Sequence, residues 1–152
     1  MNASIETPDT ESAHRLADLW VELARDQRSS RSHLLAEPNR ERVREAMVRH
    51  IIAGTVRVAE RKDGIVGFVT FGGESESYEQ DVQRGFIYNL YVREADRNLG
   101  IGSALLESAE AALDERGFDI IALQVMAPNE NARRFYRRHG YEPQRIELEK
   151  PI

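Results

Sequence analysis

One arginine and two glycines stand directly ahead of an apolar, helix-forming stretch, in the order Arg97-x-x-Gly100-x-Gly102. The first amide groups of a helix have no partner within the helix, and the helix dipole is positive at that end. Because glycine lacks a Cβ atom, a ligand can approach the backbone closely at Gly100 and Gly102, and Arg97 adds a full positive charge. The pattern predicts a binding site for a phosphate or pyrophosphate. For these residues taken alone, a tight strand-to-helix connection without a ligand is the alternative.

Two other phosphate-binding loops fit the same residues poorly. A Walker A loop ends in Gly-Lys-Ser/Thr, whereas Gly102 is followed by Ser103 and Ala104, without a lysine. A dinucleotide fingerprint requires a third glycine, and Leu105 stands at that position. It also requires an acidic residue after the following strand, and residues 125–128 offer none.

The elements that must position this loop read as strand, helix and strand. Residues 86–92 are aromatic and β-branched, which predicts a mostly buried strand. Residues 103–116 carry their apolar side chains on one helical stripe, and Gly117 stands where a helix commonly ends on a residue with positive φ. Residues 120–125 form a second apolar strand. Short connections through one helix predict a parallel strand pair with a right-handed crossover.

Further strands and helices are predicted on both sides of this unit. We expect strands at residues 4–7, 55–60, 65–71 and 142–150, and helices at residues 10–25, 40–52 and 130–139. An Asp-Gly hairpin turn at Asp63 joins two of these strands, and an acidic connector at residues 74–81 precedes the central strand. A length of 152 residues suits one domain with a substantial core, so we expect a single domain over residues 1–152.

Composition narrows the class of protein. The chain has a formal net charge of -5, which disfavours a nucleic-acid-binding domain, and its hydrophobic content of 41% is typical of a globular protein. No apolar run is long enough to span a bilayer, and acidic residues precede the first apolar stretch, so we expect neither a membrane span nor a signal peptide. The absence of cysteine excludes disulfides and thiolate metal ligands, and it fits a cytoplasmic protein.

The last predicted helix carries a second motif. Its residues are Asn129, Ala132, Phe135, Tyr136, Gly140 and Tyr141, in the spacing N-x-x-A-x-x-F-Y-x-x-x-G-Y. This segment and the glycine loop resemble two signature motifs of the GCN5-related N-acetyltransferase (GNAT) superfamily, in the same order and separated by one predicted strand. Asn98 stands where that family often has glycine, and asparagine is among the residues that most readily adopt left-handed backbone angles.

The resemblance covers nearly the whole chain and implies an α/β (α+β) fold of the GNAT type. That fold has a central mixed sheet of six to seven strands flanked by four helices, and its parallel strand pair would splay apart here after Asn89. The resemblance also implies an enzyme that uses acetyl-CoA as co-substrate and no metal. Such an enzyme transfers the acetyl group to a primary amine by direct attack in a ternary complex.

The resemblance assigns parts of the chain to the coenzyme. The backbone of Leu90, Tyr91 and Val92 would pair with the pantetheine arm as an added strand, and an amide near Leu90 would polarise the thioester oxygen. The other implied coenzyme-binding residues are Arg97, Asn98, Leu99, Gly100, Ile101, Gly102 and Ser103 around the pyrophosphate, with Asn129 and Asn131 near the pantetheine. Tyr136 matches the tyrosine that protonates the departing thiolate; packing against the sheet is its alternative role.

The general base is not specified by the sequence. Some relatives place a glutamate on the central strand, but residues 86–92 contain no carboxylate. The remaining candidates are Tyr88, Asn89, Glu74, Glu76, His33, His50, His139 and a backbone carbonyl acting through water.

The acceptor is also open at this stage. A compact chain favours a small-molecule or amino-acid-type amine, with a protein lysine or N-terminus as one alternative and a non-catalytic acyl-CoA-binding module as another. The basic loop with Arg25, Arg28, Arg31 and His33 reads either as a wall for an acidic acceptor or as a solvated surface. The acidic connector at residues 74–81 would suit a cationic substrate. A homodimer could form through an exposed sheet edge or the C-terminal strand.

Overall fold

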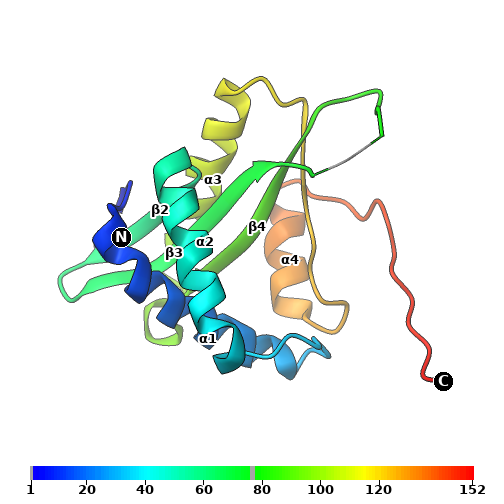
Figure 1. The fold of residues 1–152 in the computed structure, drawn as a ribbon. Helices are drawn as coiled ribbons and strands as arrows, with labels where there is room; N and C mark the ends of the chain where they lie inside the picture. Colours follow the sequence, from blue (N-terminus) through cyan, green and yellow to red (C-terminus); the bar gives the residue numbers. More distant parts are fainter. Residues whose placement is uncertain (1, 76–77) are drawn as a thin grey trace.

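The computed structural model describes residues 2–75 and 78–152 (Figure 1). Its strands are β1 (Ser4–Glu6), β2 (Val56–Arg61), β3 (Gly64–Gly73), β4 (Arg84–Val92) and β5 (Ile120–Leu123). Its α-helices are α1 (Ala13–Arg28), α2 (Arg40–Ala53), α3 (Ile101–Glu115) and α4 (Glu130–Arg138). Short 3-10 helices lie at Thr10–Ser12, Glu37–Asn39 and Glu94–Asp96.

The described strands form one five-stranded sheet in the order β1-β2-β3-β4-β5. Neighbouring strands are antiparallel except for β4 and β5, which run parallel and are joined through α3. The predicted parallel pair is therefore confirmed. The hairpin between β2 and β3 turns at Lys62 and Asp63, as the Asp-Gly signal predicts, because Arg61 pairs with Gly64 across it.

Helix α3 lies between two glycines with left-handed backbone angles. Gly100, at its amino end, has a φ of 83°, and Gly117, just after its carboxyl end, has a φ of 87°. Both angles lie in the region that favours glycine, which explains why this helix begins and ends where it does. The helix begins at Ile101, earlier than the predicted start at Ser103. None of the helices in the described ranges is long and apolar enough to cross a membrane.

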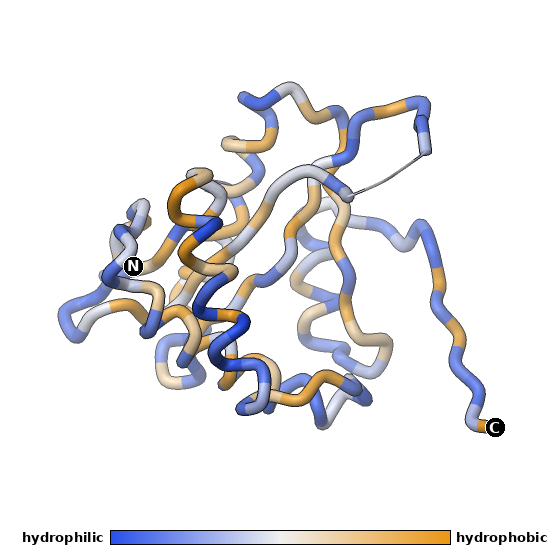
Figure 2. The backbone as a smooth tube through the Cα atoms, in the orientation of Figure 1, coloured by the Kyte–Doolittle hydropathy of each residue, from blue (hydrophilic) through white to orange (hydrophobic). Residues whose placement is uncertain are grey.

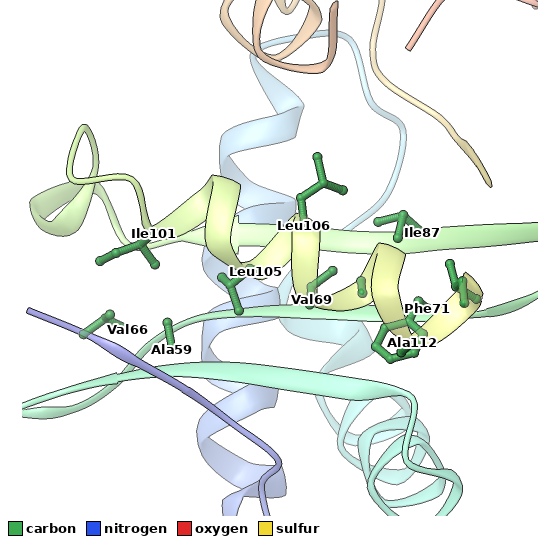
Figure 3. Packing of buried hydrophobic residues seen from close by; sticks show 11 residues of the cluster. Ala59, Val66, Val69, Phe71, Ile87, Ile101, Leu105, Leu106 and Ala112 are labelled. Atoms are coloured by element: carbon green, nitrogen blue, oxygen red, sulfur yellow. The ribbon is translucent and has the colours of Figure 1, made fainter. Parts of the chain in front are cut away.

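Apolar side chains pack on both faces of the sheet. On one face, Leu105 and Leu106 of α3 pack against Val69 of β3 (Figure 3). On the other face, α1 and α2 cover the sheet, with Met47 of α2 packed in a cluster around Phe68 of β3. Figure 1 shows α1 and α2 on one side of the sheet and α3 on the other.

One prediction about the sheet is wrong. Residues 142–150 do not form a closing strand; the chain turns away after Gly140, which has a φ of 89°, and runs extended beside the domain (Figure 1). The described sheet therefore has five strands, not six to seven. An alternating pattern specifies a strand only when a neighbouring strand pairs with its backbone, and within the described residues no strand pairs with this segment.

Candidate active site

Strands β4 and β5 separate partway along the sheet. Their parallel pairing runs from Arg84, opposite Ile120, to Ile87, opposite Leu123. On its other edge, β4 stays paired with β3 as far as Val92. Within the described residues, no strand pairs with the β5-facing edge of β4 beyond Ile87. The splay begins at Ile87 instead of the predicted Asn89. It leaves an unpaired backbone edge, here named the slot, along Leu90, Tyr91 and Val92, the three residues expected to bind pantetheine.

A β-bulge marks the point where the slot begins. The register of β3 and β4 shifts because Thr70 pairs with Asn89 while Phe71 pairs with Ile87, which leaves Tyr88 as the extra residue. The Asn89 side chain donates from Nδ2 to Thr70 Oγ1 at 2.8 Å, and the Tyr88 hydroxyl donates to the Gly73 carbonyl oxygen. Bulges often re-aim side chains beside active sites. The bulge was not predicted; two consecutive glycines, Gly72 and Gly73, follow it on β3 and were the local signal for it.

The glycine loop follows β4 and leads into α3. Asn98 has a φ of 64°, which confirms that it adopts the left-handed conformation expected of it. A Cβ atom on Gly100 would meet nothing within 4 Å, so positive φ, and not crowding, requires glycine there. The space beyond Gly100 is open, as a site for an anion at the helix amino terminus would need.

An ion-pair cluster around a buried carboxylate lies in the segment between β4 and this loop. Asp96 is almost fully buried, and it accepts hydrogen bonds from Arg93 and Arg61, each at 2.8 Å. The hydrogen bonds from these two guanidinium groups, Arg93 first, hold the pKa of Asp96 below its usual range. The sequence did not single out Asp96, because Arg61, on β2, lies 35 residues away and becomes its neighbour only in the folded chain.

Arg97 lies differently from the prediction. Its Nε donates to the Val92 carbonyl oxygen at 2.8 Å, and its Nη2 donates to Asp26 Oδ2 at 3.2 Å. The guanidinium group also lies over the Tyr91 ring. These contacts place it on the α1 side of β4, next to a cavity of about 510 Å³ whose lining includes the carboxylates Glu22 and Asp26. The structure thus does not bring the Arg97 charge to the loop amides; it pairs that charge with α1.

The amino end of α3 is tied to α4. Ser103 Oγ lies 2.9 Å from His139 Nε2, and the His139 ring packs against Phe135 with ring centres 4.8 Å apart. Phe135 also lies beside Gly102, where an added Cβ would be 3.6 Å away. Leu99, next to Gly100, is exposed, whereas Ile101 is buried in the core. Ile101 therefore anchors the amino end of α3 in the core, whereas the Leu99 side chain faces solvent.

Tyr136 lies on α4 in apolar surroundings. Its ring centre is 5.2 Å from that of Phe135 and 5.9 Å from that of Tyr141. Burial raises the pKa of Tyr136 to about 12, so its phenol stays protonated at neutral pH. A protonated phenol has the chemistry of a proton donor.

The two asparagines at the start of α4 have local partners. Asn129 Oδ1 accepts from the Ala132 amide at 3.1 Å, so Asn129 is the N-cap of α4. Asn131 Oδ1 accepts from Arg134 Nη2. The cap leaves the Asn129 Nδ2 group as the atom with which this residue would donate to a pantetheine carbonyl.

Two of the candidate bases share a cavity of about 310 Å³ between α2 and the bulge. His50 and Tyr88 both line it, with ring centres 5.9 Å apart, and His50 Nδ1 lies 2.7 Å from Thr55 Oγ1. Burial and then the charge of Arg49 lower the pKa of His50 below its ordinary value, so the imidazole is neutral at pH 7. A small amine bound in this cavity would lie next to the His50 side chain.

The other candidates are placed differently. Glu74 pairs with Arg84, His33 pairs with Glu149, and His139 pairs with Ser103. Glu76, also a candidate, lies outside the described residues. Among the described residues, no group of three or more His, Cys, Asp or Glu side chains could hold a metal ion.

Comparison with known proteins adds a family match and one curated relative. The sequence profile of the acetyltransferase (GNAT) family matches residues 13–141. An uncharacterized N-acetyltransferase from Methanocaldococcus jannaschii is 34% identical over 90 residues, which cover 59% of this chain and 53% of the relative. The chain thus spans about half the length of that relative.

Solved structures share the fold. A GCN5-related N-acetyltransferase from Ralstonia eutropha JMP134 superposes with a TM-score of 0.78 at 24% identity, covering 99% of this chain and 98% of that one. An aminoglycoside acetyltransferase from an uncultured soil metagenomic sample, in complex with sisomicin, gives 0.69 at 20% identity, covering 99% and 97%. Arabidopsis thaliana Naa50, in complex with a bisubstrate analogue, CoA-Ac-MVNAL, gives 0.70 at 22% identity, covering 95% and 86%. At these identities the likeness establishes the fold.

Proposed function

Because the chain belongs to the acetyltransferase (GNAT) family, we propose that it transfers an acetyl group from acetyl-CoA to a primary amine within a ternary complex. Family membership confirms the resemblance found in the sequence. The observation that carries the proposal is the unpaired edge of β4, which leads directly into a loop with left-handed backbone at Asn98 and Gly100. We further propose that residues 1–152 act as a single N-acetyltransferase domain.

The β4 edge and the loop would hold the two ends of the coenzyme. Backbone groups of Leu90, Tyr91 and Val92 would pair with the pantetheine amides as strand addition does at a sheet edge. The loop amides from Leu99 to Ser103 would hold the pyrophosphate at the positive end of α3. Arg97 would join them only after leaving Asp26, so coenzyme binding competes with an ion pair that already exists.

The chemical step needs a neutral amine, a polarised carbonyl and a proton for the departing sulfur. The amine nitrogen attacks the thioester carbon and forms a C–N bond, and a backbone amide near Leu90 stabilises the oxyanion. When the C–S bond breaks, the Tyr136 phenol protonates the thiolate. A pKa of about 12 would make a phenol a weak acid for this purpose in water. The same apolar surroundings would also raise the pKa of the thiol, so the pKa values of the phenol and the thiol would rise together.

His50 is the general base that the geometry favours. The Thr55 hydroxyl lies 2.7 Å from His50 Nδ1 and 3.4 Å from the His50 carbonyl oxygen. Nδ1–H can donate to Thr55 Oγ1 while that hydroxyl donates to the carbonyl, which leaves Nε2 unprotonated. An alkylammonium has a pKa of about 10 in water, so an amine must lose a proton before it attacks. His50 Nε2 would accept that proton, directly or through a water.

A small-molecule or amino-acid-type amine is the acceptor that the cavity supports. Its volume of about 310 Å³ lies at the small end of the range for ligand pockets. The similar structures include one with an aminoglycoside antibiotic and one with a peptide-containing analogue, so fold alone does not choose between small and protein acceptors. If the enzyme acetylates a protein lysine or N-terminus instead, the proposal of a small-molecule or amino-acid-type acceptor is wrong.

Calorimetric titration with acetyl-CoA tests the proposal. We expect micromolar binding by the wild type and its loss in Gly100→Trp. Gly64→Trp is the matched control, because Gly64 also has a positive φ, 109°, and open space around it, but lies in the β2–β3 turn. Thiol release would then be screened with small amines and with peptides. If the wild type does not bind acetyl-CoA, or if both tryptophan variants bind alike, the loop is only a structural turn.

A further inference from the structure

The side of α2 that borders the His50 cavity carries one arginine. Four residues of α2 line this cavity: Ala46, Arg49, His50 and Ala53. Their spacing of i, i+3, i+4 and i+7 places all four on one side of the helix. Because the two alanines are small, Arg49 and His50 are the side chains of α2 that can reach far into the cavity.

The apolar face of α2 fixes how the helix lies on the sheet. Figure 2 shows hydrophilic and hydrophobic residues alternating along α2, which can be located from its label in Figure 1. Met47 is buried in the cluster around Phe68 of β3. Since this contact sets the rotation of α2 about its axis, Arg49 and His50 are held beside a cavity that β3 and β4 also line.

The charge of Arg49 is not balanced by a nearby acid. Within the described residues, no Asp or Glu lines the cavity, and none lies within salt-bridge distance of Arg49, Glu45 one turn earlier included. By contrast, Arg40 and Arg44 of the same helix pair with acidic side chains. Arg49 is exposed, so its guanidinium group can donate hydrogen bonds to a bound molecule.

One carboxylate acts on the β4 side of the cavity, but both of its oxygens are engaged. Burial and then the charge of Glu74 raise the pKa of Tyr88, which lines the cavity. Glu74 Oε1 accepts from Gln80 Nε2 at 2.9 Å, and Glu74 Oε2 lies 3.4 Å from Arg84 Nη2. The Glu74 side chain is only 14% exposed. An ammonium group in the cavity would have to displace Arg84 to pair with this carboxylate.

This charge arrangement disfavours a simple amine. An alkylammonium has a pKa of about 10, so an amine arrives with a positive charge. A cavity bordered by Arg49 repels that charge unless the same molecule carries an acidic group. The charge of Arg49 is also felt at His50, where it adds to the effect of burial in lowering the pKa. An acid paired with Arg49 would leave the amine of the same small molecule close to His50, the next residue in the chain.

We propose that the acceptor carries an acidic group, a carboxylate or a phosphate, in addition to its amine, and that Arg49 binds this group. The inference rests on the proposed acetyl transfer to a small amine in the His50 cavity. A guanidinium group presents parallel N–H donors that match the oxygens of a carboxylate or a phosphate. Phe71 and Tyr88 also line the cavity, so the carbon chain between amine and acid would lie against aromatic rings. Arg49 thus selects the substrate, and amines without an acidic group are poor acceptors.

Matched pairs of acceptors test this selection. Thiol release from acetyl-CoA is compared for amino acids and their carboxamides, and for aminoalkyl phosphates and the corresponding amino alcohols. We expect the wild type to favour the acidic member of a pair by about tenfold or more in kcat/KM, mainly through KM. Arg49→Gln should abolish this preference. Arg42→Gln removes an exposed arginine of α2 that does not line the cavity, and it should keep the preference. A wild type without a preference, or an equal preference in both variants, overturns the inference.

Binding of reaction products tests the same contact without coenzyme or turnover. Mixtures of N-acetyl amino acids and N-acetyl aminoalkyl phosphates are compared with their neutral counterparts by saturation-transfer NMR. We expect the wild type to bind the acids in preference to the neutral molecules and Arg49→Gln to lose this difference. Because Arg49 is exposed, circular dichroism should report intact folding of the variant. A wild type that binds both forms alike, or neither, contradicts the inference.

The two experiments separate this inference from the proposed function. If neutral amines are acetylated as readily as acidic ones, the acetyl transfer stands and the role of Arg49 is wrong. If product binding depends on Arg49 but no amine releases thiol from acetyl-CoA, the acid-binding site stands and the proposed transfer is wrong.

Discussion

Asn89 donates a 2.8 Å hydrogen bond to the hydroxyl of Thr70 across the point where the register of β3 and β4 shifts. Thr70 is fully buried, so this bond satisfies polar groups that water cannot reach. It also closes the bulge that leaves Tyr88 as the extra residue on β4. The bulge in turn stands at the start of the slot, so one side-chain contact connects the core of the sheet to the proposed site.

Thr70→Val should therefore weaken both the fold and the proposed activity. It keeps the shape of the side chain but leaves the Asn89 amide without its acceptor, and we expect the free energy of unfolding to fall by about 1–3 kcal/mol. In Thr70→Val/Asn89→Leu both polar partners are gone, so much of that loss should return. Urea denaturation of the two single variants and the double variant measures the coupling. Purely additive losses would show that the bond contributes nothing.

Asp26→Ala should strengthen acetyl-CoA binding. Removal of the carboxylate frees Arg97 for the pyrophosphate, and exposed ion pairs contribute about 0.2–1 kcal/mol, so the Kd should fall by up to about fivefold. Glu22→Ala removes the same charge from the same cavity without freeing Arg97, and it serves as the control. Calorimetric titration compares the variants. Equal affinities in Asp26→Ala and Glu22→Ala would indicate that Arg97 does not reach the coenzyme.

Tyr136→Phe should slow the reaction without weakening coenzyme binding. The ring that packs against Phe135 is kept, while the proposed proton donor is lost, and general acid catalysis is typically worth about 10²–10⁴-fold in rate. We expect kcat to fall by about 10²-fold or more, with the Kd for acetyl-CoA unchanged. Tyr78→Phe, the same substitution at an exposed tyrosine, is the control and should leave kcat unchanged. A fall in coenzyme affinity with little change in kcat would assign Tyr136 to packing.

His50 should produce the acidic limb of the pH–rate profile. Burial lowers its pKa, so the neutral base persists at pH values somewhat below the ordinary pKa of about 6.5, and activity should be lost as the pH falls further. Stability should fall earlier, as the pH drops from about 6.5 toward the lowered pKa, and should level off below it, because only between these values does the unfolded chain bind the proton that the folded protein resists. His50→Gln should reduce kcat and remove this limb. His33→Gln, at an exposed histidine, should keep it, and a wild-type profile in His50→Gln would place the base elsewhere.

Elements whose pattern is contained in a few consecutive residues could be predicted from the sequence. The helix between Gly100 and Gly117 follows from apolar spacing and two residues able to adopt positive φ, and the N-cap at Asn129 follows from its own side chain. The glycine loop and the α4 motif, taken together, are also sufficient to indicate the family. Local patterns succeed because backbone angles and capping bonds depend mainly on near neighbours in the chain.

Contacts between distant segments were decided by the tertiary structure. Arg97 binds Asp26, which is 71 residues away, and His50 meets Tyr88 only because α2 packs across the bulge. The C-terminal segment has a strand pattern, but no strand among residues 2–75 and 78–152 pairs with its backbone. Local residue order is enough to specify which segments can form helices, turns and an anion-binding loop. The contacts between those elements depend on the folded chain, because a charged side chain or a strand backbone can pair only with a group that folding places next to it.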